Sequence, residues 1–311
     1  MGQRIGTWKR AASQDLPRLL DYLLPQEWRA VPFTSRLLRQ GKAFLPNRLD
    51  GTVGLLVAPS GGPGAGSAGP SAVSGAFLRT AGGLVLPVMP YLPDPEREAR
   101  LAEVPVPRNA LRPLAGGRVY SIMGPAAEVH WLEGAMGFQP VASVEYALMT
   151  LNQGDFRPCG AEDPSVLRGL RVRLADVGDL NRLFPLQKAY ELEEVVVFPD
   201  RFTDQSCRLN LRRTLRQQLV LVAELHGRAV AKAGTNARGF HADQIGGVYT
   251  VEELRGGGIA AVVMSELLER IFRARRTVSL FVKTANPPAL RLYRKLGFRS
   301  LDAYRISYLQ G

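Results

Sequence analysis

The chain has 311 residues, 46% of them hydrophobic and 22% charged, which is typical of a globular protein and long enough for two domains. No apolar run reaches the roughly 18–20 residues of a membrane helix, and the N-terminus lacks the apolar segment of a secretory signal. The net charge is +12, and residues 201–311 hold 19 basic and 8 acidic residues. We therefore expect something anionic, such as nucleic acid, an acidic membrane surface or a polyphosphate, to bind the last third.

The cysteine and histidine contents argue against a metal enzyme and against a disulfide framework. Only Cys159 and Cys207 are present, and the three histidines form neither an HExxH motif nor a Cys/His cluster. The composition therefore predicts no metal and two free thiols in a reducing compartment. We expect a cytoplasmic protein that does not enter a membrane.

The first half of the sequence has a mixed α/β pattern. A helix is predicted at 15–24 from its apolar face, and helical structure is predicted again at 36–43. The pattern then predicts strands at 51–57, 74–78, 83–89 and 119–123, a helix from Pro125 to about Gly134, and a last strand at 144–151. The segment 58–74 is rich in Pro, Gly, Ser and Ala, which predicts a surface loop.

A second break in the pattern divides the chain into two domains. Residues 153–166 contain Gly, Pro and acids but few apolar side chains, so we expect a linker between domains at 1–152 and 167–311. The second domain is predicted to contain strands at 170–174, 219–224, 229–233, 244–250, 278–284 and 304–309, and helices at 176–195, 204–216, 258–272 and 288–296. Both halves follow a similar order of helices, hairpin, strand, helix and strand, which suggests a duplication.

Three glycines, Gly256, Gly257 and Gly258, stand where a strand turns into a helix. Glycine lets the backbone approach a ligand closely, and amides at a helix start can bind a pyrophosphate through their N–H groups and the helix dipole. Arg255 adds a positive charge. A glycine-rich turn without a ligand would have the same pattern, and the spacing is not that of a dinucleotide-binding GxGxxG motif.

Two motifs resemble signatures of one family. Arg255-x-x-Gly258-x-Ala260 resembles (Q/R)xxGx(G/A), the acetyl-CoA signature of the GCN5-related N-acetyltransferase (GNAT) superfamily. About thirty residues further on, the segment 286–298 resembles the second signature, NxxAxxxYxxxGF. The first half has no counterpart of the first signature, since Met123-Gly124-Pro125 occupies the corresponding strand-to-helix position. The chain thus resembles a tandem-GNAT protein whose N-terminal repeat is degenerate and is not expected to bind CoA.

The resemblance implies an α/β fold with two GNAT-like domains, each a mixed, mostly antiparallel sheet flanked by helices. It implies acetyl-CoA as co-substrate, with the pantetheine arm along the strand at 248–251 and the pyrophosphate on the amides 256–260. The implied cofactor-binding residues are Val248, Tyr249, Thr250, Val251, Arg255, Gly256, Gly257, Gly258, Ile259, Ala260, Asn286, Ala289 and Tyr293.

The family's catalytic acid maps onto Tyr293. A phenol with a pKa near 10 stays protonated and can donate to a leaving thiolate. The alternative is a core aromatic, because Tyr293 shares a helix face with Ala289 and Leu296. Asn286 would contact the CoA arm, or it could simply begin the helix before two prolines.

The family fixes no general base. Glu193 and Glu194, at the end of the first helix of the second half, are the main candidates, and Glu224 and Glu252 are secondary ones. Each could equally be a solvated surface acid. The function expected is direct acetyl transfer from acetyl-CoA to an amine acceptor in the second domain. The alternative is an inactive GNAT-derived module that binds an acidic partner such as nucleic acid. The sequence leaves open the acceptor and whether the chain forms a homodimer.

Overall fold

The structure is a computed structural model that describes residues 6–40, 51–57, 72–90, 96–105, 119–160 and 168–310. The chain forms two compact units, one of Met1–Leu148 with Leu301–Gly311 and the other of Met149–Ser300. Most of the expected surface loop, at 58–71, and residues 161–166 of the expected linker lie outside the described residues. No helix among the described residues is long and apolar enough to cross a membrane.

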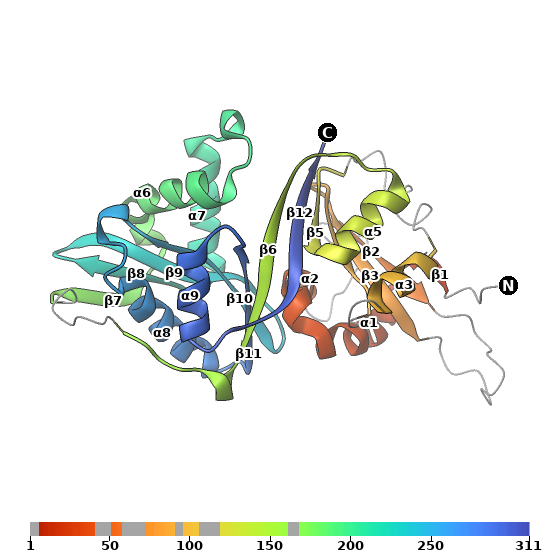
Figure 1. Ribbon diagram of the computed structural model, residues 1–311, viewed down its shortest axis with the longest axis horizontal. Helices are drawn as coiled ribbons and strands as arrows, with labels where there is room; N and C mark the ends of the chain where they lie inside the picture. The colour runs from red at the N-terminus through yellow and green to blue at the C-terminus, as the bar shows by residue number, and fades with distance from the viewer. Residues whose placement is uncertain are drawn as a thin grey trace. The chain divides into compact units, whose positions relative to one another are not determined.

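The sheet of the first unit has the strand order β1-β2-β3-β4-β5-β12. Its strands are antiparallel except for β4 and β5, which run parallel. Their bounds are β1 Thr7–Arg10, β2 Gly51–Val57, β3 Val73–Thr80, β4 Leu84–Val88, β5 Ser121–Pro125 and β12 Arg299–Leu309. The helices are α1 Leu16–Leu23, α2 Glu27–Gln40, α3 Glu96–Glu103 and α5 Ala126–Met136. Strand β6 (Pro140–Asn152) follows α5 in the chain (Figure 1), and the division between the two units falls within it, after Leu148.

Three features of the first unit differ from the sequence prediction. Strand β1 and helix α3 were not expected, because β1 has only four residues and α3 is mostly charged. Helix α2 begins at Glu27 rather than at residue 36. It contains Pro32 in its interior, and a proline there normally indicates that a helix is broken.

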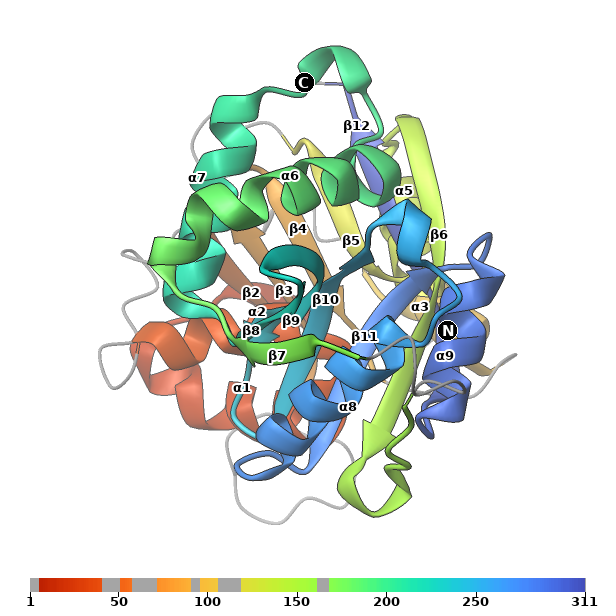
Figure 2. The ribbon, with the colours of Figure 1, turned by 90° about the vertical axis from the view of Figure 1, so that its left-hand side faces the viewer.

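The sheet of the second unit has the strand order β11-β10-β9-β8-β7, antiparallel except for the parallel pair β10 and β11. The strands are β7 Leu170–Leu174, β8 Val220–Leu225, β9 Arg228–Arg238, β10 Ala242–Thr250 and β11 Thr277–Lys283. The α-helices are α6 Leu180–Tyr190, α7 Asp204–Gln217, α8 Ile259–Phe272 and α9 Pro287–Lys295. Helices α6 and α7 lie over one face of the sheet and α8 over the other (Figure 2). The predicted mixed α/β fold with mostly antiparallel sheets is confirmed.

The two units repeat one order of elements. In each, a strand, two helices, a hairpin, a strand, a helix, a parallel strand and a helix follow one another. The repeat corrects one alignment made from the sequence. Met123-Gly124-Pro125 lies on β5, which is equivalent to β11, so it is not the counterpart of the glycine loop after β10. The counterpart is the connection from β4 to α3, and its sequence (residues 89–95) contains three prolines and no glycine.

The described part of the expected linker, 153–160, packs on the second unit. The Gln153 amide donates to the Arg276 carbonyl (2.9 Å), and the Arg157 amide donates to the Leu296 carbonyl (3.1 Å). The Cys159 amide donates to Ser265 Oγ of α8 (3.0 Å). The last strand also differs from expectation, because β12 pairs with β5 and residues 301–311 belong to the first unit.

A buried charge network ties β12 to the helices of the first unit. Arg29 of α2 pairs with Glu128 of α5, and Arg97 of α3 pairs with Asp302 of β12 at 2.8 Å. A further contact of 3.6 Å joins Arg29 to Asp302. All four side chains are at most 7% exposed, so each charge depends on its partners for the solvation that water would otherwise give.

We expect Asp302→Asn to lower the free energy of unfolding by about 3–5 kcal/mol, because two buried guanidinium groups lose a counter-charge. Urea denaturation measures the loss. The matched control is Glu103→Gln, which removes an exposed carboxylate paired with Arg100 and should change the stability by under about 1 kcal/mol. Equal effects of the two variants would contradict a stabilising role for the network.

Candidate active site

The site is built where β10 and β11 separate. The parallel pairing runs from Ala242↔Thr277 to Gln244↔Ser279 and stops there, although β10 continues to Thr250. On its other edge β10 stays paired with β9 as far as Thr250↔Ala231. The second half of β10 therefore has a backbone edge facing β11 without a strand partner there among the described residues. Near its end, the buried Oγ1 of Thr250 also lacks a hydrogen-bond partner in the described structure.

A β-bulge interrupts the β10–β9 ladder in this same half of the strand. Gly246 pairs with Gly234 and Tyr249 with Lys232, so three steps along β10 match two along β9. Gly246 and Gly247 both suit this local geometry. A Cβ on Gly246 would overlap the side-chain amide of Asn236 unless that side chain moved, and Gly247 adopts a φ of +65°, which favours glycine.

Two side chains bind the backbone of Gly247. Lys232 Nζ donates to the Gly247 carbonyl oxygen (2.8 Å), and the Gly247 amide donates to Tyr190 Oη (3.3 Å). The Lys232 ammonium also lies 4.6 Å from the centre of the Tyr190 ring. Burial lowers the pKa of Lys232 to about 8 and raises that of Tyr190 to about 12. Sequence reasoning missed both residues. The Gly246-Gly247 pair inside a strand signals a bulge, whereas nothing in the sequence marks Lys232 as buried.

The predicted glycine loop follows β10 and ends at α8. Gly256 and Gly258 adopt left-handed φ angles of +80° and +81°, and Gly258 is the N-cap residue of α8. A Cβ on Gly256 would have no atom within 4 Å. Within the described residues, the amides of Gly256, Gly257 and Gly258 donate to no backbone acceptor. Amides at such a helix start are suited to an anion, and pyrophosphate binding at this loop stays a prediction.

Arg255 holds the loop rather than extending freely into solvent. Its Nε donates to the Thr250 carbonyl (3.1 Å), and its Nη2 forms an ion pair with Glu193 (2.8 Å). The guanidinium carbon also lies 5.2 Å from the centre of the Tyr249 ring. The hydrogen bond and ion pair with Glu193 raise the pKa of Arg255. Arg255 therefore stays charged and fixes the loop to β10.

Glu193 and Glu194 lie on η6 (Glu191–Val195), a π-helical turn that extends α6. Glu194 accepts from Asn286 Nδ2 (3.0 Å) and lies 3.4 Å from Lys283 Nζ, while Lys283 donates to the Glu193 carbonyl (3.0 Å). Both candidate bases are thus brought to the opening between β10 and β11, and both carboxylates are paired. Of the other two candidates, Glu224 is held by Arg173 and Arg182, and Glu252 lines a pocket.

Asn286 uses both atoms of its side-chain amide. Its Oδ1 accepts from the Ala289 amide (3.1 Å), which makes it the N-cap of α9, and its Nδ2 binds Glu194. The helix-entry alternative is therefore present in the structure. Ile259 is buried, so of that residue the backbone amide at the start of α8 is the part suited to a ligand.

Tyr293 is buried on α9, 7% exposed, with its ring centre 5.8 Å from that of Phe298. Burial raises its pKa above the ordinary value, and the nearby Tyr190 and Glu194 add to the shift. The phenol therefore stays protonated well above neutral pH. Tyr293 is thus a core aromatic, as its helix face predicts, whose phenol stays protonated near the carboxylate of Glu194.

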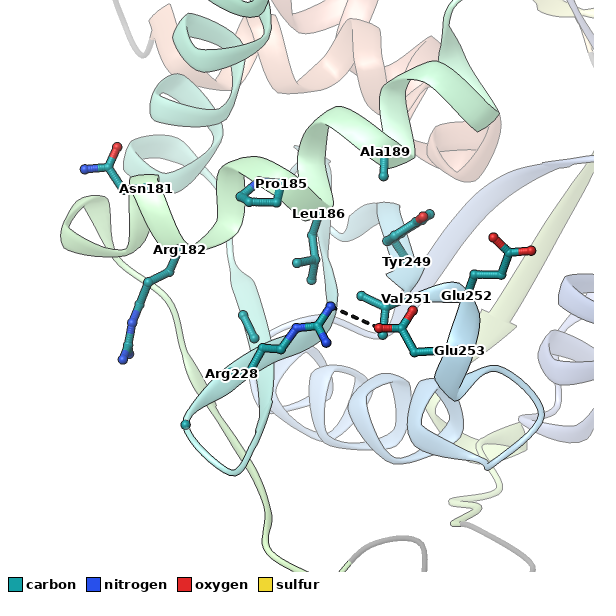
Figure 3. Close-up of a pocket in the computed structure, with 12 residues that line it drawn as sticks. Asn181, Arg182, Pro185, Leu186, Ala189, Arg228, Tyr249, Val251, Glu252 and Glu253 are labelled. Atoms are coloured by element: carbon teal, nitrogen blue, oxygen red, sulfur yellow. Dashed lines mark ion pairs between the residues drawn. The ribbon is translucent and has the colours of Figure 1, made fainter.

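A pocket of about 560 Å³ lies on the α6 side of the end of β10 (Figure 3). It brings together the predicted residues Tyr249 and Val251 with residues of α6 and of the β8–β9 turn. Its lining carries an ion pair between Arg228 and Glu253 (3.0 Å). The other predicted cofactor-binding residues lie outside this pocket, along the β10 edge, the glycine loop and α9.

Comparison with known proteins gives the class of the second half. Residues 183–298 match the model of the acetyltransferase (GNAT) family, which covers the split strands, the glycine loop and α9. The resemblance to the family is confirmed for this part of the chain, which is a GNAT acetyltransferase domain, the domain of an acyltransferase. No curated protein matches the sequence.

Solved structures resemble the chain over nearly its whole length. A Drosophila protein, 13% identical, has a TM-score of 0.60 and covers 98% of this chain and 99% of its own. A tandem GNAT protein from the clavulanic acid biosynthesis pathway, 16% identical, has a TM-score of 0.55 and covers 97% of both chains. At these identities the similarity is one of fold, and it includes both halves.

The capping bond of Asn286 can be separated from its bond to Glu194. Asn286→Ala removes both and should lower the free energy of unfolding by about 1 kcal/mol, the usual cost of losing an N-cap. Asn286→Ser keeps a capping oxygen and loses only the bond to Glu194, so it should cost under about 0.5 kcal/mol. Chemical denaturation distinguishes the two, and equal losses would show that the cap contributes little.

Proposed function

We propose that the second half of the chain transfers an acetyl group from acetyl-CoA directly to an amine, and that the first half does not bind CoA. The observation that carries the proposal is the meeting of two unpaired backbone surfaces at one end of β10. One is the edge of β10 beyond Gln244, where the pairing with β11 has ended. The other is the run of amides at Gly256–Gly258. The acetyltransferase family match supports the same reaction.

The residues present suit the parts of acetyl-CoA. The backbone of 248–251 would pair with the amides of the pantetheine arm, because the ladder to β11 ends before it. The Oγ1 of Thr250, which has no hydrogen-bond partner among the residues that the structure describes, offers a further polar contact there. The amides from Gly256 to Ala260 would bind the pyrophosphate, and the open space beside Gly256 leaves room for it.

The proposed chemistry is a single acyl transfer. The amine nitrogen attacks the thioester carbonyl carbon, the C–N bond forms, the C–S bond breaks, and the amine gives up one proton. Tyr293 donates its phenolic proton to the leaving sulfur. Glu194, directly or through water, accepts the proton of the amine, while Glu193 holds Arg255. Backbone amides of β10 polarise the carbonyl as the charge develops on its oxygen.

The acceptor is an amine on a small molecule, a peptide or a protein. We propose a cytoplasmic location because both cysteines are free thiols, which suits a reducing compartment. The alternative, a GNAT-derived module for an acidic partner, draws on α7, where Arg212, Arg213 and Arg216 are exposed. Binding of nucleic acid that falls steeply with salt, without CoA binding, would favour it.

Calorimetric titration with acetyl-CoA tests the cofactor site. We expect micromolar binding to the wild type and at least tenfold weaker binding to Gly256→Asp, because a carboxylate beside the loop amides repels phosphate at a cost of roughly 1.4 kcal/mol or more.

The matched control is Gly137→Asp. Gly137 also has a left-handed φ, +69°, and also has no atom within 4 Å of an added Cβ, so it bears the same backbone strain away from the loop. It should bind acetyl-CoA like the wild type. A folded wild type that binds no acetyl-CoA would overturn the proposal.

With an amine acceptor in hand, Tyr293→Phe should lower kcat by about 10²–10⁴-fold, the usual contribution of a general acid. The Kd for CoA should stay within about twofold, since the ring and its contact with Phe298 remain. Steady-state kinetics beside calorimetry makes the measurement. A kcat close to that of the wild type would leave Tyr293 as a core aromatic only.

A further inference from the structure

The bulge in β10 has an unusual means of support. Gly247 and Val248 stand opposite the single residue Ala233 of β9, so neither has a register partner of its own, and both lie beyond the last β10–β11 pair. The regular ladder is interrupted at this segment. Its shape depends instead on the two side-chain contacts to Gly247, from Lys232 on the neighbouring strand and from Tyr190 at the end of α6.

Burying the Lys232 amine at this place costs desolvation free energy. Lys232 is 4% exposed on a strand whose neighbouring residues from Ala229 to Ala233 are all buried and apolar. The groups that face it are the Tyr190 ring of α6, Glu191 of η6 and Cys207 of α7. An apolar side chain would fill this space without the cost of burying an amine. Its one direct hydrogen bond in the described structure is to the Gly247 carbonyl.

We propose that Lys232 is a positioning residue for acetyl transfer, which together with Tyr190 holds the β10 bulge so that the Val248 amide is free to polarise the thioester carbonyl. This inference rests on the proposed function. Lys232 touches no reacting atom in it. The side chain takes the place of the ladder hydrogen bond that β9 cannot make at the bulge, and Tyr190 occupies the Gly247 amide. The next amide, that of Val248, is then the first one left for a ligand.

The two ligands CoA and acetyl-CoA separate this role from a general structural one. They differ only in the acetyl group, so a contact with the thioester carbonyl strengthens the binding of acetyl-CoA alone. One net hydrogen bond corresponds to roughly a three- to tenfold preference for acetyl-CoA in the wild type. Calorimetry with both ligands measures the preference as the ratio of the two Kd values.

Lys232→Met keeps the length of the side chain and removes the amine. The expected result is a Kd ratio near one, with the Kd for CoA itself within about twofold of the wild type. Lys188→Met is the matched control. It removes a partly exposed amine of α6, which pairs with Asp204 at 2.9 Å. This variant should leave the ratio of the two Kd values unchanged.

Several outcomes would overturn the inference. These are an unchanged ratio in a folded Lys232→Met variant, an equal loss of affinity for both ligands, or a wild type with no preference. Failure of the folded wild type to bind either ligand would instead overturn the proposed function itself. If Lys232→Met does not fold, Tyr190→Phe decides, because it keeps the ring under Lys232 and removes only the oxygen that binds the Gly247 amide. Its ratio should fall in the same direction, and an unchanged ratio would refute the inference.

Discussion

The parting of two parallel strands is the constraint on which the rest of the second unit depends. β10 and β11 pair through three positions and then separate, which leaves polar backbone groups on the edges of both strands. Such groups are costly when buried without a partner. Arg255 binds one such group of β10, the Thr250 carbonyl, and under the proposed function the remainder of the edge would bind the ligand. A strand edge kept open inside a domain, instead of being covered, is a feature of a binding site more than of a packed core.

The end of α6 supplies many of the side chains that hold this opening in shape. The helix ends in a π-helical turn, in which the Val196 amide donates to the Glu191 carbonyl (2.7 Å). Because a π turn has an extra residue, Tyr190, Glu193 and Glu194 reach three different elements: the bulge, the glycine loop and the start of α9. Single π turns within helices are often found at functional sites. Here one such turn connects both separated strands with the loop between them.

The sequence predicts the elements of the second unit well because hydrophobic periodicity and glycine placement are local signals. The glycine loop, its strand and its helix lie where the motif predicts them, and the cap of Asn286 follows from a polar residue before two prolines. The partners of Glu193, Glu194 and Lys232 are non-local, since they come from residues 15 to 92 positions away. No pattern within one segment reports them. In the first unit, missing the charged helix α3 displaced the repeat by one strand and misassigned Met123-Gly124-Pro125.

The first unit has a parallel strand pair equivalent to β10 and β11, with charged side chains of its own beside it. β4 and β5 also run parallel, through two paired positions, and then separate. Just beyond β4, the Met89 carbonyl accepts a hydrogen bond from Arg29 Nη1 (3.3 Å), and Arg29 also pairs with the buried carboxylate of Glu128. Burial raises the pKa of Glu128 to about 7 although Arg29 opposes the shift, so the pair is held in place at a cost in desolvation. The connection that follows has three prolines, which lack N–H donors, where the second unit has glycine amides. The two units therefore differ beside their parallel strands: the first carries buried charges there, and the second has the glycine amides to which we assign the ligand.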